Sequence, residues 1–339
     1  MSAVSLSPAE RSLVEARDSA SFAEVLAVFT GAEVPGRGTP AIAGSYALDA
    51  EGLHFRPLFP FVSGLRYTAR LDLGRGAPLV EVFAVAPPTG EGPRVTAVFP
   101  SGDTLPENAL RVYLHFSRPM QARDVQRHVR LERPDGSVVP LAFVEVQHGL
   151  WDGRRTRLTL LFHPGRIKRG VAPGERLGPP LRAGETYRLV VDKAVRDASG
   201  RPLGRDFEWR IRVTAADRES PRAEGLRVSA PGDVGAPLVV ELPEPLDEAL
   251  LHRLVWVEDA RGRPVAGTAS VSNGETRWSF RPERDWSPGR YGLRVHPALE
   301  DRAGNRFDRV FDREGGTATS GAAAETPLRL EFAVETEGR

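Results

Sequence analysis

The stretch Phe162-His163-Pro164, followed by Gly184-Glu185-Thr186-Tyr187, belongs to a pattern that occurs three times along the chain. The other copies are Phe55-Arg56-Pro57 with Gly64-Leu65-Arg66-Tyr67, and Phe280-Arg281-Pro282 with Gly289-Arg290-Tyr291. Self-similarity of this kind indicates repeated structural modules. At 339 residues the chain is also too long for one ordinary core. We therefore expect two or three tandem domains.

The second and third copies match over a stretch that needs no gap. Pro119 corresponds to Pro245, Gly136 to Gly262 and Val139 to Val265. Linker-like polar, Pro- and Gly-rich segments lie at 87–93 and 215–221. We predict three domains, with a truncated module at 20–92, a second at 93–215 that carries a long basic loop insertion, and a third at 216–339.

Strict alternation of apolar and polar residues marks the strands. Val112, Leu114 and Phe116 alternate with Arg111, Tyr113 and His115, and 207–213 repeats the pattern. Such a period is typical of antiparallel sandwich sheets with one buried and one solvated face. The only expected helix is short and N-terminal, at 7–18, where Ser7 and Glu10 have capping-box spacing. The sequence thus predicts an all-β protein of tandem antiparallel β-sandwiches.

Several motifs resemble the bacterial Ig-like domain of the SbsA (surface-layer protein) type. They are the opening 95–102, the step Phe116-Ser117-Arg118-Pro119-Met120, the Gly-x-x-Tyr strand and the turn Asp301-Arg302-Ala303-Gly304-Asn305. The resemblance is strongest over 93–215 and weakest over 20–92. It implies tandem Ig-like β-sandwiches of bacterial surface or secreted proteins, used as spacers or binding modules, and no particular activity.

Composition excludes several function classes. The chain has no cysteine, so disulfides and thiolate chemistry are absent. The sequence contains no run of 18 apolar residues, so no membrane span is expected. The first residues lack the pattern of a signal peptide. The net charge of +1 argues against a general polyanion binder. We expect a cell-envelope or extracellular protein, with a cytoplasmic one as the alternative, and the oligomeric state stays open.

The turns Asp197-Ala198-Ser199-Gly200 and Asp301-Arg302-Ala303-Gly304 have a structural interpretation. Asp caps backbone N–H groups and Gly takes positive φ. Calcium needs six to eight oxygen ligands, whereas each turn offers one carboxylate with few acidic neighbours. We therefore predict no metal and no cofactor.

Positive charge is concentrated in the middle module, where 152–182 holds eight basic and two acidic residues. Guanidinium groups beside aromatic rings suit carboxylate, phosphate or sulfated glycan. The candidate ligand-binding residues are Trp151, Arg154, Arg155, His163, Arg166, Lys168 and Arg169. The alternative is that this stretch is a solvated arginine loop that only packs against the neighbouring module. An anionic glycan or a protein is the expected partner.

Catalytic signals are weak. The seven histidines form no metalloprotease motif, and there is no nucleophile elbow or phosphate-binding loop. Glu145 and Asp152 are a conceivable carboxylate pair for glycoside hydrolysis. A carbohydrate-active enzyme or glycan-binding protein with a site around 145–182 is therefore the alternative to a non-catalytic scaffold. Nucleic acid is not expected as a partner, because aromatic residues rarely interleave with the basic ones.

Overall fold

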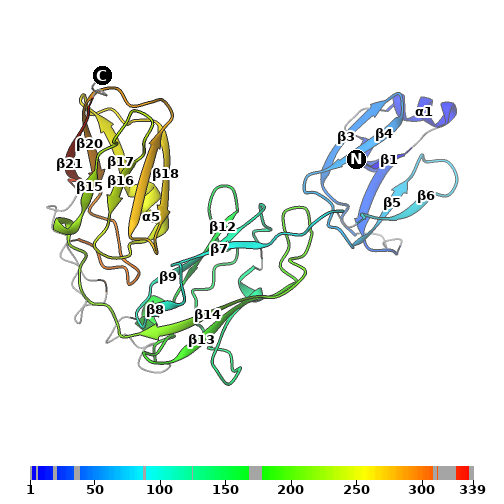
Figure 1. Cartoon of the computed structure of the whole chain (residues 1–339). Coiled ribbons are helices and arrows are strands. Elements are labelled where there is room, and N and C mark those ends of the chain that lie inside the picture. The colour runs from blue at the N-terminus through cyan, green and yellow to red at the C-terminus, as the bar shows by residue number, and fades with distance from the viewer. Residues whose placement is uncertain are drawn as a thin grey trace. The chain divides into compact units, whose positions relative to one another are not determined.

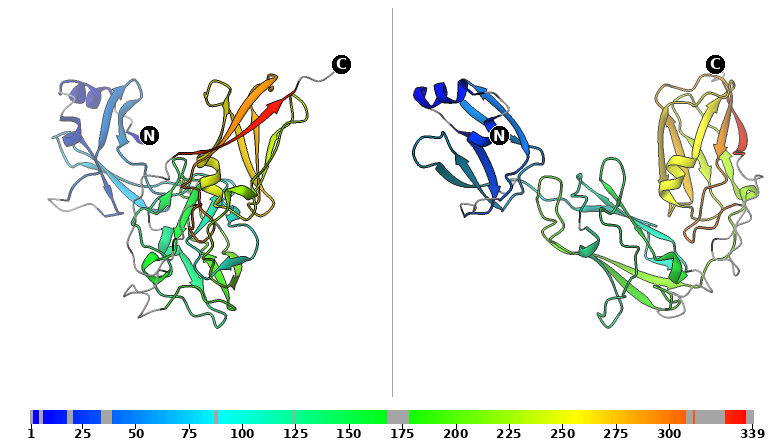
Figure 2. Two further views of the ribbon diagram at one scale, coloured as in Figure 1. Left: turned by 90° about the vertical axis from the view of Figure 1, so that its left-hand side faces the viewer. Right: turned by 180° about the vertical axis from the view of Figure 1, so that it is seen from behind.

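The computed structural model describes residues 2–4, 7–17, 21–33, 39–86, 89–123, 125–167, 178–307, 311 and 326–335. These residues form six small sheets, two in each of three modules (Figure 1). Two further views show the same strand-rich build in every module (Figure 2). The prediction of an all-β protein made of tandem antiparallel sandwiches is confirmed.

The middle sandwich is the most complete. Its first sheet has the order β11 (Leu150–Trp151), β12 (Arg157–Leu161), β9 (Arg111–Phe116), β7 (Val95–Phe99). Its second sheet has the order β10 (Val129–Glu132), β13 (Thr186–Val191), β14 (Phe207–Thr214), β8 (Thr104–Pro106). All pairs are antiparallel except β14 with β8. Short helical turns occupy Val125–His128 and α3, Pro164–Ile167.

The third sandwich repeats this topology with one strand fewer among the described residues. The sheets are β15 (Arg227–Ser229), β16 (Leu238–Glu241), β19 (Arg277–Pro282), β18 (Gly267–Ser272), and β17 (Val255–Asp259), β20 (Gly289–Val295), β21 (Leu328–Val334). A 3-10 turn spans Ala223–Gly225, and helix α5 spans Glu248–Leu254. The cores of both sandwiches come from the inward side chains of the two sheets, such as Leu114 and Leu189, or Val240 and Leu293.

The first sandwich is shorter. Its sheets are β1 (Ser2–Val4), β4 (Gly52–Pro57), β3 (Gly44–Asp49), and β2 (Leu26–Thr30), β5 (Arg66–Leu71), β6 (Leu79–Ala84). Within the described residues no strand corresponds to β7 or β15. Helix α1 (Pro8–Glu15) begins at the predicted capping box, because Ser7 accepts from the Glu10 N–H and Glu10 accepts from that of Ser7. Helix α2 (Phe22–Val25) and strand β1 were not predicted.

The repeated tyrosine anchors the turn that enters each of β5 and β20. The Tyr67 hydroxyl accepts from the Val62 N–H at 2.7 Å, and the Tyr291 hydroxyl donates to the Ser287 carbonyl at 2.9 Å. A tyrosine near the start of this strand that bonds back to the preceding corner is typical of Ig-like sandwiches. The Tyr187 hydroxyl donates to Glu185 at 2.7 Å and also interacts with the backbone of Arg182 in the preceding corner.

By compactness the chain divides into two units. One holds residues 1–91 with 198–201, and the other holds 92–197 with 202–339. The middle and third sandwiches therefore lie within one unit. The domain limits predicted at 92/93 and 215/216 stay predictions.

Candidate functional site

The joint between the middle and third sandwiches contains several buried charged side chains, among them Asp247, Glu248 and Glu300. It begins on β9, whose inward residues fill the middle core as predicted. The opposite face is not solvated, because Tyr113 is only 4% exposed. Its hydroxyl lies 2.9 and 2.8 Å from the two carboxylate oxygens of Asp247 in the third sandwich. The expectation of a wet face on β9 is wrong here.

Arg111 joins the same network two residues earlier on the strand. Its guanidinium lies 3.5 Å from Asp247 and also contacts Glu300, both in the third sandwich. Glu300 accepts a further bond from Arg306 at 3.0 Å. The alternation of β9 places Arg111 and Tyr113 side by side on one face. One strand of the middle sandwich thus holds two carboxylates of its neighbour.

Asp247 is fixed by its own fold as well as by the joint. It is the N-cap of α5 and accepts from the Leu250 N–H at 3.0 Å, while its backbone N–H donates to the Glu300 carbonyl. Burial raises the pKa of Asp247 although Arg111 opposes that change. Burial, and then the nearby charge of Asp247, also raises the pKa of Tyr113. The phenol therefore stays a neutral hydrogen-bond donor.

A second carboxylate of α5 faces two imidazoles. The buried Glu248 carboxylate lies 3.2 Å from His252 Nε2 and 3.8 Å from Nε2 of His115, which extends from β9. Burial opposes ionisation, but these imidazoles outweigh it and lower the pKa of Glu248 to about 2. The carboxylate is thus charged across the neutral range.

Loops close the rest of the joint. The Leu110 N–H donates to the Arg302 carbonyl at 3.0 Å, and the Ser101 N–H donates to Glu275 at 3.0 Å. Glu275 is buried and also pairs with Arg302 at 2.7 Å. Between these contacts lies a cavity of about 10 Å³, lined among others by Arg111 and Tyr113, which is room for about one water. These paired groups indicate a fixed contact rather than a loose one. Among the described residues of the joint, the buried atoms His115 Nε2, Glu248 Oε2 and Arg302 Nε have no hydrogen-bond partner.

The linker between the two sandwiches is tied down at Asp217. Asn108 donates to the Asp217 carbonyl at 2.6 Å and accepts from its N–H at 2.8 Å. Asn305 also donates to that carbonyl, at 3.3 Å. This linker is therefore held from both sides.

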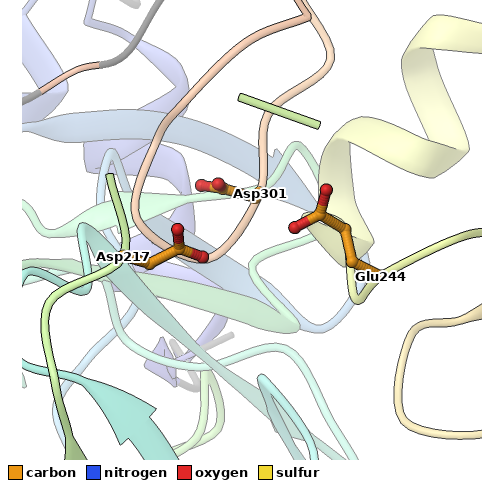
Figure 3. Close-up of side chains that lie close together, drawn as sticks. All are labelled: Asp217, Glu244 and Asp301. Carbon is orange, nitrogen blue, oxygen red and sulfur yellow. The ribbon is translucent and has the colours of Figure 1, made fainter. Parts of the chain in front are cut away.

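Three carboxylates meet at the same place. Asp217, Glu244 and Asp301 have oxygens within 4.8 Å of one another and point toward a common point (Figure 3). Asp301 is 2% exposed and caps its turn, accepting from the Ala303 and Asn305 N–H groups at 2.8 and 2.9 Å. The capping role predicted for Asp301 is confirmed. The expectation that its carboxylate has few acidic neighbours is wrong, because chain folding brings two others to it.

Crowding changes how these groups titrate. Burial raises the pKa of Asp301 to about 6, against the bonds from Asn305. Burial, followed by the charges of Asp301 and Asp217, raises the pKa of Glu244 to about 7. Carboxylates at this spacing are the ligand type that hard cations prefer. The prediction of no metal is not tested by the cluster alone.

The predicted ligand residues of the middle sandwich do not form one surface. Arg154 and Arg155 are exposed. Trp151 is half-buried, lies against Phe116 with ring centroids 5.7 Å apart, and has its indole N–H 3.4 Å from the Ala122 carbonyl. His163 is half-buried and accepts from the Gly165 N–H at 3.2 Å. Lys168 and Arg169 lie outside the described residues. The proposal that these side chains bind an anion stays a prediction.

Arg166 occupies a different environment from the one expected of a ligand contact. It is 3% exposed, and its guanidinium donates to the Gly178 carbonyl at 2.8 Å and to the carbonyls of Pro140 and Pro179. Burial, followed by the charge of Arg133, lowers its pKa. The side chain holds together the two ends of the basic insertion.

The carboxylates considered for glycoside hydrolysis also have separate surroundings. Asp152 accepts from the Thr156 and Arg157 N–H groups at 2.7 and 2.9 Å, and these bonds lower its pKa against the effect of burial. Glu145 borders a concavity of about 340 Å³ whose lining does not include Asp152. The geometry thus gives Asp152 a turn-capping role and does not pair it with Glu145.

Comparisons with known proteins give a coarse result. No protein-family model matches the chain, and no curated protein matches it. Among solved structures, the N-terminal Ig1-2 module of the Drosophila receptor protein tyrosine phosphatase DLAR is 12% identical, with a TM-score of 0.22 over 62% of this chain and 93% of that one. The insect immune protein hemolin is 11% identical, with a TM-score of 0.18 over 92% and 67%.

A third similar structure is a Bacteroides ovatus protein, SGBP-B, in complex with a mixed-linkage heptasaccharide. It is 13% identical, with a TM-score of 0.20 over 83% of this chain and 55% of that one. These likenesses are too distant to carry an argument about function. The Ig-like architecture follows from the sheets of the chain itself. No helix among the described residues is long and apolar enough to cross a membrane.

Proposed function

We propose that the chain is a non-catalytic scaffold of tandem Ig-like modules, in which the middle and third sandwiches act as one rigid body. The contact of Tyr113 and Arg111 with Asp247 carries this proposal. Buried charge-assisted hydrogen bonds hold one orientation, because any sliding would leave Asp247 buried and unpaired. A spacer that positions other groups requires that stiffness.

The finer proposal is a bacterial cell-envelope or secreted protein. It rests on the resemblance of 95–102, 116–120 and 301–305 to the SbsA-type Ig-like domain. Fractionation of the native cell tests it. Recovery in the envelope or medium is expected, and recovery in the cytoplasm alone would contradict it.

The absence of cysteine allows a direct test of rigidity. Spin labels at Arg205→Cys and Ser272→Cys, both exposed positions, report the distance between the two sandwiches. A narrow distance distribution is expected for the full chain. Adding Tyr113→Phe and Glu300→Gln should broaden it, whereas adding Asp103→Asn, at an exposed ion pair on the middle sandwich, should not. A broad distribution in the chain with the joint intact would refute the proposal.

A further inference from the structure

A basic groove lies over the outer face of the middle sandwich, away from the residues of the joint. Its lining includes Arg133, Asp135, Thr186, Arg188 and Arg210. The concavity measures about 460 Å³, within the range of roughly 300–1,000 Å³ that is common for small-ligand sites. These arginines are spread along the chain from the turn after β10 to β14, so no local sequence pattern indicates that they lie together.

The arginines are not balanced in the usual way. Arg188 and Arg210 lie directly opposite each other on β13 and β14. Like charges in directly opposite positions destabilise a sheet. Arg188 is compensated by Glu132 and Glu208, at 2.5 and 3.3 Å. Arg210 is paired through its backbone in β14, but its exposed side chain has no hydrogen-bond or ion-pair partner within the part of the chain that the structure describes. One guanidinium over the groove is thus left to meet something else.

The third sandwich shows that the fold does not require these arginines. The β10 turn and its counterpart have the same bonds, Gly136 N–H to the Arg133 carbonyl at 2.9 Å and Gly262 N–H to the Asp259 carbonyl at 3.0 Å. Strand pairing then equates Arg188 with Gly292, and Arg210 with Glu331. At the three equivalent positions the third sandwich thus carries Asp259, Gly292 and Glu331 in place of the arginines. A structural need common to the repeat cannot explain them.

We propose that this groove binds an acidic glycan, a chain of sugars that bears carboxylates. The arginine guanidinium groups offer forked donors that match a carboxylate. Asp135, whose pKa is lowered by bonds from Ser137 and by the charge of Arg133, is an ionised acceptor in the same groove. A sugar hydroxyl can donate a hydrogen bond to the Asp135 carboxylate, whereas the negatively charged oxygens of a polyphosphate would be repelled by it.

Other anionic polymers fit less well. An extended peptide would bind by adding a strand to a free edge, but β13 is paired on both sides by β10 and β14. The edge of β10 is covered by the segment that follows its turn, where the Val139 N–H donates to the Leu131 carbonyl at 2.8 Å. A single-stranded nucleic acid would need exposed aromatic rings for stacking, and Tyr187, the aromatic residue of the lining, is buried. This inference goes beyond the proposed scaffold role and does not depend on the joint.

The test uses the full chain and two variants with the same change in net charge. R133D/R210E places the third sandwich's own residues in the groove, and R123E/R205E changes two exposed arginines elsewhere on the middle sandwich. Each protein is titrated calorimetrically with a galacturonic acid oligomer and, separately, with the methyl ester of that oligomer. The ester keeps the hydroxyls and loses the negative charge. Polyphosphate and polyglutamate serve as anions of other classes. Thermal melting establishes that each variant is folded.

We expect the acidic oligomer to bind the native chain and R123E/R205E equally, and to bind R133D/R210E at least tenfold more weakly. The methyl ester should not bind. D135N should weaken binding of the oligomer severalfold and leave polyphosphate unaffected or tighter. The inference is overturned if the oligomer fails to bind the native chain, if R133D/R210E binds it normally, or if polyphosphate or polyglutamate binds as tightly.

Discussion

Two outer faces of the middle sandwich have the same sequence pattern, but one is buried against the third sandwich and the other is exposed to solvent. On β9, Arg111 and Tyr113 alternate with core residues and are covered by the third sandwich. On β14, Glu208 and Arg210 alternate in the same way and are exposed. Alternation identifies the side chains that leave their own core, but it does not say whether they meet water or another module. The side chains that the neighbouring module presents decide whether such a face is buried or exposed.

Among substitutions on these two faces, we expect the largest loss in the free energy of unfolding at Asp247. Asp247→Ala removes the acceptor of Tyr113 and the counter-charge of Arg111, and it also removes the cap of α5. Removing one partner of a buried ion pair costs about 3–5 kcal/mol, and because Arg111 keeps its pairing with Glu300 the loss should lie toward the lower end of that range. We expect this loss in the free energy of unfolding measured with urea.

The matched change on the open side is Asp103→Ala, which removes the exposed partner of Arg212. It should cost less than about 1 kcal/mol. Equal losses for the two variants would mean that the third sandwich does not cover β9.

A smaller effect, with a pH signature, is expected at Glu248. Its pKa falls from an ordinary value of 4.5 to about 2, so its stabilisation is present above pH 4.5 and is lost as the pH falls toward 2. Glu248→Gln should cost on the order of 2 kcal/mol at pH 7. The difference from the native chain should shrink between about pH 4.5 and 2. A constant difference over this range would rule out the imidazole pairing as its cause.

Glu244 should show the opposite sign and a smaller size. Because its pKa is raised from 4.5 to about 7, its ionisation opposes folding, and the native chain should lose stability as the pH rises from about 4.5 to 7. Glu244→Gln should remove part of that slope and stabilise the chain at about pH 8 by less than about 1 kcal/mol, since the group is only half-buried. Asp206→Asn, at an exposed carboxylate away from the cluster, is the control and should leave the slope unchanged.

Arg210→Glu should have the least effect on stability. The side chain has no partner among the described residues, and the third sandwich carries Glu331 at the same place, so we expect a change within about 0.5 kcal/mol. Melting curves of the two proteins should overlap. A loss of more than about 1 kcal/mol would show that Arg210 supports the sheet.

The sequence was sufficient for what depends on neighbours along the chain. Period-two alternation predicted the strands, Ser7 and Glu10 predicted the start of α1, and Asp301 with Gly304 predicted a capped turn. Each of these rests on residues within a few positions of one another. The fold class could therefore be predicted before any coordinates.

The candidate sites could not be predicted, because they depend on contacts between distant residues. Tyr113 and Asp247 are 134 positions apart, and nothing near either residue indicates the other. The carboxylates at 217, 244 and 301 meet only when the linker and two loops of the third sandwich converge. A comparison of the repeats would have shown that Gly292 and Glu331 stand in the third sandwich at the positions of Arg188 and Arg210, and that signal was present in the sequence.

A double-mutant cycle between Tyr113→Phe and Asp247→Asn in the full chain tests the account most directly, because the two residues belong to different sandwiches and are joined through the Tyr113 hydroxyl. If β9 is covered as described, the two unfolding free-energy changes should fail to add, with a coupling of at least about 1 kcal/mol. Additive changes, with a coupling near zero, would mean that the middle and third sandwiches are not held together by this joint.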